Sequence, residues 1–345
     1  MPGSSRDPLA GKLPVTLVTG FLGSGKTTLV SKLVRHPAMN RVAVVINELG
    51  EIGIDHDLVA MSTENIALLA NGCVCCSVRT DLQETLRDLF ARRRAGEVAD
   101  FDRVIIETTG LADPAPVVQT LLADALVCAH FRLDGLVTLV DAVNGAQQLL
   151  EHAEPAKQIA LADRVFLTKS DIAPPEAVEE LRAAIAQINP GAEARLVLHG
   201  EVDPQALTGL GLASARAGEA TLRFLGAPLQ GEGTGGEKRL GRLHDGSIRT
   251  LALHFDTPFT WDSFSAALEL LTTLRGPDLL RVKGIVNVEG QPVVVQGVQH
   301  IFHPPVTLDR WPGADRRTRL VFITRRIEAA TIRDLLEAVA RAAPP

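Results

Sequence analysis

The sequence of 345 residues has few cysteines, no histidine-rich tract and no apolar run long enough to cross a membrane. Four cysteines, three of them within Cys73–Cys76, do not supply the disulfide framework of a secreted domain. Apolar runs such as Val42–Ile46 have the length of a strand, not the roughly 20 residues of a membrane-spanning helix. The N-terminal stretch MPGSSRDPLAGKLP lacks the apolar core of a signal peptide. We therefore expect a cytoplasmic protein with no membrane partner.

The charge balance also limits the function classes. The chain carries 41 acidic and 35 basic residues, which gives a net charge of −6. Binding to a phosphate backbone needs a basic surface, so nucleic acid is not an expected partner. A hydrophobic content of 46% with 22% charged residues is that of an ordinary globular protein, and the length suffices for two domains.

Short apolar runs alternate with helical stretches over the first part of the chain. Runs such as VTLVTG, RVAVVINE and DRVIIETTG are rich in Val and Ile, which is typical of parallel strands buried on both faces. A Gly-rich polar segment follows, and then the pattern strand, helix, strands, helix. We predict an α/β fold with a doubly wound, mostly parallel sheet and a second, smaller α+β domain. The expected boundaries are 1–14 for a flexible N-terminus, 15–204 for the first domain, 205–245 for a linker and 246–345 for the second domain.

The stretch GFLGSGKT, Gly20–Thr27, matches the phosphate-binding pattern G-x-x-x-x-G-K-[ST] at every position. It follows an apolar strand run and precedes the helical TLVSKLV, the setting in which backbone N–H groups at a helix N-terminus bind phosphate. In this pattern Lys26 reaches the β- and γ-phosphates, and the hydroxyl of Thr27 binds Mg²⁺. The candidate nucleotide-binding residues of this loop are Gly20, Gly23, Ser24, Gly25, Lys26, Thr27 and Thr28.

A second motif, LTKSD at the end of another apolar run, resembles the N-K-x-D signature by which GTPases recognise guanine. Lys169 would lie along the plane of the base, and the Asp171 carboxylate would accept hydrogen bonds from the guanine N1–H and exocyclic amine. Adenine has no matching pair of donors, so this carboxylate selects guanine. Thr168 replaces the usual Asn, which helps to tie this loop to the phosphate loop, so the change bears on affinity rather than on base choice.

Two acidic segments are positioned to serve the metal ion that accompanies the nucleotide. In the stretch IIETTG, Glu107 follows the apolar residues of the strand run and Gly110 follows the run itself, where P-loop NTPases have an acid that supports Mg²⁺ and a glycine that senses the γ-phosphate. Lys26 and Glu107 are therefore the candidate catalytic residues. Glu48, in the loop INELGEIGID, is a candidate Mg²⁺ ligand together with Thr27. The simpler alternatives are that Glu107 caps the next segment and that the Glu48 loop is a polar connection.

Several stretches together resemble the G3E family of P-loop GTPases, and most closely its CobW-like branch of metallochaperones. The stretches are TGFLGSGKTT, INELGEIGID, NGCVCCSV, ETTGLADP and TKSD, with LLRVKGIVNV and VVQGVQHIFHPP similar to the second domain of that branch. The resemblance implies a GTPase domain over residues 15–204 that uses GTP and Mg²⁺, and a CobW-like domain over residues 246–345. It also implies that the nucleotide state controls capture of a metal and its release to a client apoprotein.

The cysteine cluster fits metal exchange better than a closed structural site. Cys73, Cys75 and Cys76 supply three thiols, whereas a structural zinc site needs four protein ligands, and no second pair lies at zinc-finger spacing. Thiolates favour Zn²⁺ or Cu(I) and also accept Co²⁺, so Zn²⁺ is the first candidate and Co²⁺ the second. The alternatives are inert structural cysteines or a redox pair. His300 and His303 flank a strand end and are expected to be exposed or satisfied in the core rather than metal ligands.

Two other function classes remain open. A P-loop kinase or transferase needs an acceptor pocket and a lid, and the sequence shows no recognisable lid motif. A GTP-gated adaptor would bind a partner through the second domain and use the cysteines only to brace the fold. For a metallochaperone, the expected partners are the apo-form of a client metalloprotein and, under nucleotide control, a second copy of the chain in a homodimer.

Overall fold

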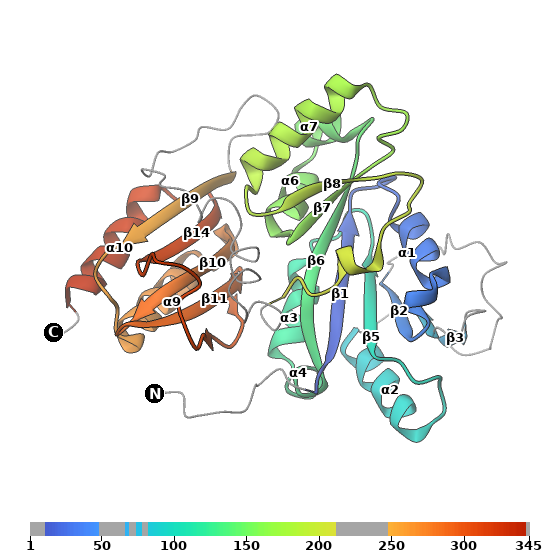
Figure 1. Ribbon diagram of the computed structural model, residues 1–345, viewed down its shortest axis with the longest axis horizontal. Coiled ribbons are helices and arrows are strands. Elements are labelled where there is room, and N and C mark those ends of the chain that lie inside the picture. The colour runs from blue at the N-terminus through green and yellow to red at the C-terminus, as the bar shows by residue number, and fades with distance from the viewer. Residues whose placement is uncertain (1–10, 48–65, 69–73, 78–81, 212–247, 343–345) are drawn as a thin grey trace.

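The computed structural model describes residues 11–47, 66–68, 74–77, 82–211 and 248–342. Figure 1 shows two units side by side, an α/β unit coloured from blue to yellow and a smaller unit in orange and red. No helix among these described residues is long and apolar enough to cross a membrane. The predicted fold class, a doubly wound α/β domain followed by a smaller α+β domain, is confirmed.

The first unit is built on an eight-stranded sheet with the order β3-β4-β2-β5-β1-β6-β7-β8. All neighbouring strands are parallel except β3 and β4. The strands are β1 (Leu13–Gly20), β2 (Val42–Asn47), β3 (Ile66–Leu68), β4 (Val74–Ser77), β5 (Arg103–Thr108), β6 (Phe131–Asp141), β7 (Arg164–Thr168) and β8 (Glu193–Val197).

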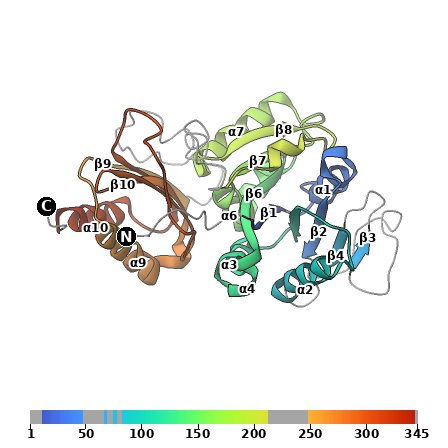
Figure 2. The ribbon, with the colours of Figure 1, turned by 60° about the horizontal axis from the view of Figure 1, so that its bottom comes forward.

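Helices cover both faces of this sheet, which explains why its strands read as continuous apolar runs. Val15 and Leu17 of β1 join one core, with side chains of α2, α3, α4, α6 and α7, whereas Val18 joins a second core with α1. Figure 2 shows α1 on one side of the sheet and α3 and α6 on the other. The helices are α1 (Lys26–Arg35), α2 (Leu82–Ala95), α3 (Ala115–Ala123), α4 (Ala125–His130), α5 (Gly145–Glu151), α6 (Ala153–Leu161) and α7 (Pro175–Ile188), with 3₁₀ turns η1 (Pro37–Met39) and η3 (Pro204–Leu207).

The second unit is an antiparallel sheet with two helices against it. Its strands pair in the order β12-β11-β10-β14-β9, and β13 also pairs with β11. Thr260 caps the first helix, because its hydroxyl accepts a hydrogen bond from the Ser263 N–H at 3.2 Å. The elements are β9 (Ile248–Phe255), α9 (Trp261–Arg275), η6 (Gly276–Asp278), β10 (Leu279–Val288), β11 (Gln291–Val298), β12 (Ile301–Phe302), β13 (Val306–Thr307), β14 (Thr318–Arg325) and α10 (Ala329–Ala342).

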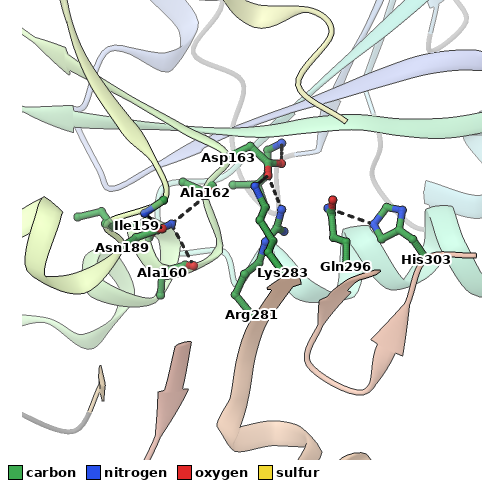
Figure 3. Close-up of polar contacts among 11 residues, drawn as sticks. Ile159, Ala160, Ala162, Asp163, Asn189, Arg281, Lys283, Gln296 and His303 are labelled. Carbon is green, nitrogen blue, oxygen red and sulfur yellow. Dashed lines mark hydrogen bonds and ion pairs between the residues drawn. The ribbon is translucent and has the colours of Figure 1, made fainter. Parts of the chain in front are cut away.

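The two units share an interface that is both apolar and ionic. Ile248, Leu280, Val298 and Ile323 of the second unit belong to the same core as α6 and α7 of the first. Within this interface, Asp163 forms ion pairs with Arg281 and Lys283 of β10, and all three side chains are buried (Figure 3). The second sheet is therefore fixed to the first unit at the residue that immediately precedes β7.

The structure differs from the sequence-based expectation at two places. Residues 205–211 were expected to begin the linker, but they pack on the first unit: Thr16 Oγ1 donates to the Leu207 carbonyl at 3.1 Å, and the Gly209 N–H donates to Asp134 at 2.9 Å. Leu207 is fully buried, so these residues serve as core rather than as a tether. The second difference is that Val74–Ser77, within the cysteine motif, form strand β4, which is absent from the predicted strands.

Candidate nucleotide- and metal-binding site

The phosphate loop connects β1 to α1 in a conformation that requires glycine at several positions. Gly25 has φ +89° and is the residue before α1, a left-handed conformation that costs other residues energy. A Cβ on Gly20 would overlap the Leu139 carbonyl oxygen and lie 2.6 Å from Ser24 Oγ. The loop backbone is therefore packed closely against β6 and leads directly into α1, whose N-terminal N–H groups can bind an anion.

Lys26 is buried and folded back over this loop. Its ammonium donates to the carbonyl oxygens of Gly20 at 2.9 Å and Phe21 at 3.1 Å. These bonds hold the charge within the phosphate loop, where a bound phosphate would compete with the carbonyls for the same ammonium group. Thr28, in the first turn of the same helix, is exposed beside the loop.

The candidate magnesium-binding residues of the described chain meet each other directly. The Thr27 hydroxyl donates to Glu107 Oε1 at 2.8 Å, and Glu107 is almost completely buried at the end of β5. One hydroxyl from the start of α1 and one carboxylate from the end of β5 are the hard oxygen ligands that Mg²⁺ prefers, so the residues fit this ion. The third predicted member, Glu48, lies outside the described residues.

The segment after β5 packs tightly on the phosphate loop. A Cβ on Gly110 would lie 2.6–2.8 Å from three atoms of Leu22, so only glycine fits at this contact. Gln158 of α6 fixes the same segment, because its amide nitrogen donates to the carbonyls of Gly110 and Ala112, both at 3.1 Å. Movement of this segment therefore bears on both the phosphate loop and α6.

The predicted base-recognition loop follows β7 and is tied to the phosphate loop. Thr168 Oγ1 donates to the Ser24 carbonyl at 2.8 Å, so threonine provides the connection that asparagine has in the usual signature. Lys169 adopts a left-handed conformation with φ +57°. Asp171 Oδ2 lies 3.5 Å from Nδ1 of His199, which belongs to the loop after β8. Gly200 of that loop approaches Thr28 of α1, so the loop after β8 borders the start of this helix.

The cysteine motif lies two strands away from Glu107 on the same sheet. Ile46 of β2 pairs with Ser77 of β4 on one side and with Glu107 of β5 on the other. Neighbouring strands are about 4.8 Å apart, so the backbones of Ser77 and Glu107 are separated by roughly 10 Å. Cys75 and Cys76 occupy β4, whereas Cys73 lies outside the described residues.

Comparison with known proteins identifies the family. A model of the CobW/HypB/UreG nucleotide-binding domain matches residues 14–195, more than half of the chain. The chain belongs to the CobW/HypB/UreG family. A model of the C-terminal domain of the cobalamin synthesis protein CobW matches residues 248–340. The predicted family, CobW-like G3E P-loop GTPases, is thus confirmed, and with it the assignment as a GTPase.

Similar proteins of this family extend over nearly the whole chain. The zinc chaperone YjiA of Escherichia coli is 33% identical, with 93% of this chain and 96% of the relative covered. The zinc chaperone CobW of Pseudomonas aeruginosa is 34% identical, with coverage of 94% and 91%. The crystal structure of Zn(II)-bound YjiA GTPase from E. coli superposes with a TM-score of 0.73 at 31% identity, over 95% of this chain and 99% of YjiA. A second Zn(II)-bound YjiA structure, of a variant with one Glu and two Cys changed to Ala, matches with the same TM-score.

Several residues of this CobW-family site were not recognised in the sequence. Asp141 forms an ion pair with Lys169, Gln158 fixes the Gly110 segment, and His199 approaches Asp171. Asp141 could have been noticed, because an acid that ends an apolar strand run lies at the ligand edge of a parallel sheet. Gln158 and His199 carry no such signal, because their positions depend on the packing of α6 and of the loop after β8.

The two histidines considered as metal ligands have different surroundings in this CobW-family chain. His300 is exposed, whereas His303 is buried and its Nε2 lies 3.4 Å from the Gln296 amide nitrogen (Figure 3). Burial, together with the nearby Arg281 charge, lowers the pKa of His303 to about 3. Over the described part of the chain, no group of three or more His, Cys, Asp or Glu side chains is arranged to hold a metal ion.

A cleft of about 540 Å³ opens between the two units. Leu111, Asp113 and Lys157 line it from the first unit, and Leu280 and Arg325 line it from the second. Lys157 forms an ion pair with Asp113 at 2.6 Å, so the segment that follows Gly110 forms one wall. The cleft thus lies between the segment that follows Gly110 and the C-terminal domain.

Proposed function

We propose that this protein is a GTP-hydrolysing metallochaperone that binds Zn²⁺ at the cysteines of its CxCC motif and transfers it to the apo-form of a client protein. Co²⁺ is the second candidate metal. The names of relatives in E. coli and P. aeruginosa as zinc chaperones support zinc as the cargo. A nucleotide-dependent homodimer stays a prediction from the sequence, as does the assignment of the ligands.

The observation that carries this proposal is the register across β4, β2 and β5. It aligns Ser77, Ile46 and Glu107 in one row, so the strand with the cysteines ends at the same edge as the strand with the magnesium-associated acid. Ligands of doubly wound sheets bind at the carboxyl ends of the strands. A metal at the motif and the γ-phosphate would therefore be close enough to share the intervening loop after β2.

The residues of the phosphate site divide the work of hydrolysis. Lys26 would leave the carbonyls of Gly20 and Phe21 to neutralise the transferred phosphoryl group. Thr27 and Glu107 would hold Mg²⁺ through their oxygen atoms, and the ion supplies charge neutralisation at the phosphates. Asp171 would accept the guanine N1–H and amino protons, while Thr168 keeps the base loop against Ser24.

Metal capture at the cysteines depends on holding thiolates close together. Thiolates repel one another and must be deprotonated to bind a metal, so a loosely held cluster binds weakly. Ordering of the segment around Glu48 by Mg²⁺ and the γ-phosphate would tighten the cluster, and hydrolysis would release it. By linkage, metal must tighten GTP binding by the same factor by which GTP tightens metal binding.

The test is a titration of Zn²⁺ and Co²⁺ against the protein loaded with a GTP analogue or with GDP. We expect metal to bind roughly 5- to 150-fold more tightly in the GTP-analogue state, the range of typical coupling free energies. Cys75→Ser and Cys76→Ser should each remove this difference, whereas Cys128→Ser, on the half-exposed side of α4, should not. Equal metal affinities in both nucleotide states would contradict the metallochaperone and favour a GTP-gated adaptor.

The readout must be the nucleotide dependence rather than zinc binding itself. A YjiA variant that lacks one glutamate and two cysteines still crystallised with Zn(II) bound, so a relative retains zinc sites beyond those residues. Lys26→Ala, which should lose GTP hydrolysis but keep the fold, serves as a second control. Because this variant does not hydrolyse GTP, metal that it binds in the GTP state should stay bound over the course of the experiment.

A further inference from the structure

Lys169 is held in one place by a buried acid on the neighbouring strand. Its ammonium lies 2.7 Å from Asp141 Oδ2, although the lysine side chain itself is 38% exposed. Its backbone also has the left-handed φ of +57°, which is uncommon for a residue other than glycine. Exposed lysine side chains are usually free to move, whereas Lys169 is restrained in both its backbone and its side chain. Such restraint is common at ligand-binding sites.

Asp141 is itself oriented by three further hydrogen bonds. Its Oδ1 accepts from the backbone N–H groups of Val143 at 2.8 Å and Asn144 at 3.2 Å. Its Oδ2 accepts from the Asn144 side-chain amide at 2.9 Å and from Lys169. Burial opposes ionisation of Asp141, but the hydrogen bonds from Lys169 and Asn144 outweigh it and lower its pKa. The carboxylate is therefore charged and fixed.

The same arrangement is joined to the phosphate loop. Asp141 pairs with Thr168 in the register of β6 and β7, and the Ala142 N–H donates to the Thr168 carbonyl at 2.9 Å. Thr168 in turn donates to Ser24. The strand ends that hold Asp141 and Lys169 are thus rigidly placed relative to the loop that binds the phosphates.

We propose that Asp141 is a positioning residue for guanine-nucleotide binding, which holds the Lys169 side chain in the extended form that covers the plane of the base. This inference rests on the proposed guanine site and adds the residue that orients Lys169 before the nucleotide binds. A free lysine side chain loses rotamer entropy when it is immobilised by a ligand, and Asp141 has already removed that freedom. Loss of the carboxylate should therefore weaken binding of any nucleotide whose base lies against Lys169.

A purely structural role for Asp141 predicts a different outcome. In that case the acid would only cap the turn that leads into α5, through its bonds to Val143 and Asn144. Its loss would then lower thermal stability without acting through Lys169. The two roles are separated by a double-mutant cycle, because a residue that acts only through another shows no additional effect once that other residue is removed.

The experiment measures GDP and GTP-analogue affinities of Asp141→Asn, Lys169→Met and the double variant of the full chain. Asparagine keeps an oxygen for the Val143 and Asn144 N–H groups and removes the charge that holds the lysine. We expect each single variant to weaken nucleotide binding roughly tenfold, which corresponds to the rotamer entropy lost when one lysine side chain is immobilised. The double variant should bind no more weakly than Lys169→Met alone. If Asp141→Asn does not fold, Asp141→Ser, which keeps one oxygen for the Val143 N–H group and removes the carboxylate, takes its place in the cycle.

The outcomes distinguish this inference from the guanine site on which it rests. A double variant weakened by the product of the two single effects, or unchanged affinity in Asp141→Asn, overturns the positioning role alone. Unchanged affinity in Lys169→Met overturns the base site as well. As a reference, Asp171→Asn should shift preference from GTP toward XTP, whereas Asp141→Asn should weaken both nucleotides equally, because Lys169 contacts the plane of the base and not its edge.

Discussion

Two buried aspartates, at opposite ends of neighbouring strands, show how one sheet uses charge for different purposes. Asp141 ends β6 at the carboxyl edge of the sheet, and its cationic partner is the half-exposed Lys169. Asp163 precedes β7 at the opposite edge, and its partners Arg281 and Lys283 are buried as well. One cation is left accessible to a ligand, whereas the other two are enclosed between domains.

The difference follows from the direction of the strands. Parallel strands place their carboxyl ends together, and loops at that edge remain open for ligands, so an ion pair there can orient a recognition group. The amino ends carry no ligand and are free to pack against another domain. Asp163 accepts from the Leu136 N–H at 2.9 Å and, despite burial, the charges of Arg281 and Lys283 lower its pKa to about 2. The acid at this edge serves the interface.

The first prediction concerns the removal of the charge of Asp163. Asp163→Asn leaves Arg281 and Lys283 buried without a negative partner, and breaking a buried pair in this way costs about 3–5 kcal/mol. We expect the free energy of unfolding, measured by urea titration, to fall by that amount while the affinity for GDP stays unchanged. Asp141→Asn should show the reverse, with little loss of stability and weaker nucleotide binding.

A matched control tests whether the loss comes from unpaired charge. Lys283→Met leaves one acid with one base, so it should cost less than Asp163→Asn. The free energy of unfolding of Asp163→Asn could instead differ from that of the wild type by less than about 1 kcal/mol, the contribution of an exposed ion pair. In that case the interface does not depend on this cluster.

The sequence predicts the carboxyl edge much better than the amino edge. The phosphate loop and the TKSD motif depend on local patterns, in which each residue is recognised by its neighbours in the chain. The Asp163 cluster joins residues more than a hundred positions apart, so no local sequence pattern predicts it. Strand β4 was missed for a related reason: VCCS is short, and its pairing with β2 and β3 decides its conformation. Glu48 and Cys73, outside the described residues, stay predictions.

The second prediction sharpens the comparison through pH. His303 has a pKa of about 3 when folded and near 6.5 when unfolded, so the unfolded chain binds more protons between these values. The contribution of His303 to the free energy of unfolding should therefore be fully present above pH 6.5. It should fall as the pH drops, by about 2 kcal/mol between pH 7 and 5. His303→Gln, which keeps a partner for Gln296, should flatten this part of the profile.

The same measurement has a built-in control. The pKa of His254 is also lowered, mainly by partial burial, so it contributes in the same direction. If buried His303 is the main source of the pH dependence of stability, His254→Gln should leave most of that dependence in place. An unchanged slope in His303→Gln would show that the histidine beside the ionic cluster is not neutral in the folded protein.

The smallest effect is expected for an exposed ion pair at the same amino edge as Asp163. Arg41, before β2, lies 2.8 Å from Asp100 and 3.4 Å from Asp102, and all three side chains are at least half exposed. Water and salt screen such pairs, so Arg41→Ala should change the free energy of unfolding by less than about 1 kcal/mol. High salt should reduce even this difference. A loss comparable to that of Asp163→Asn would mean that position at the amino edge, and not burial, determines how much an ion pair stabilises this fold.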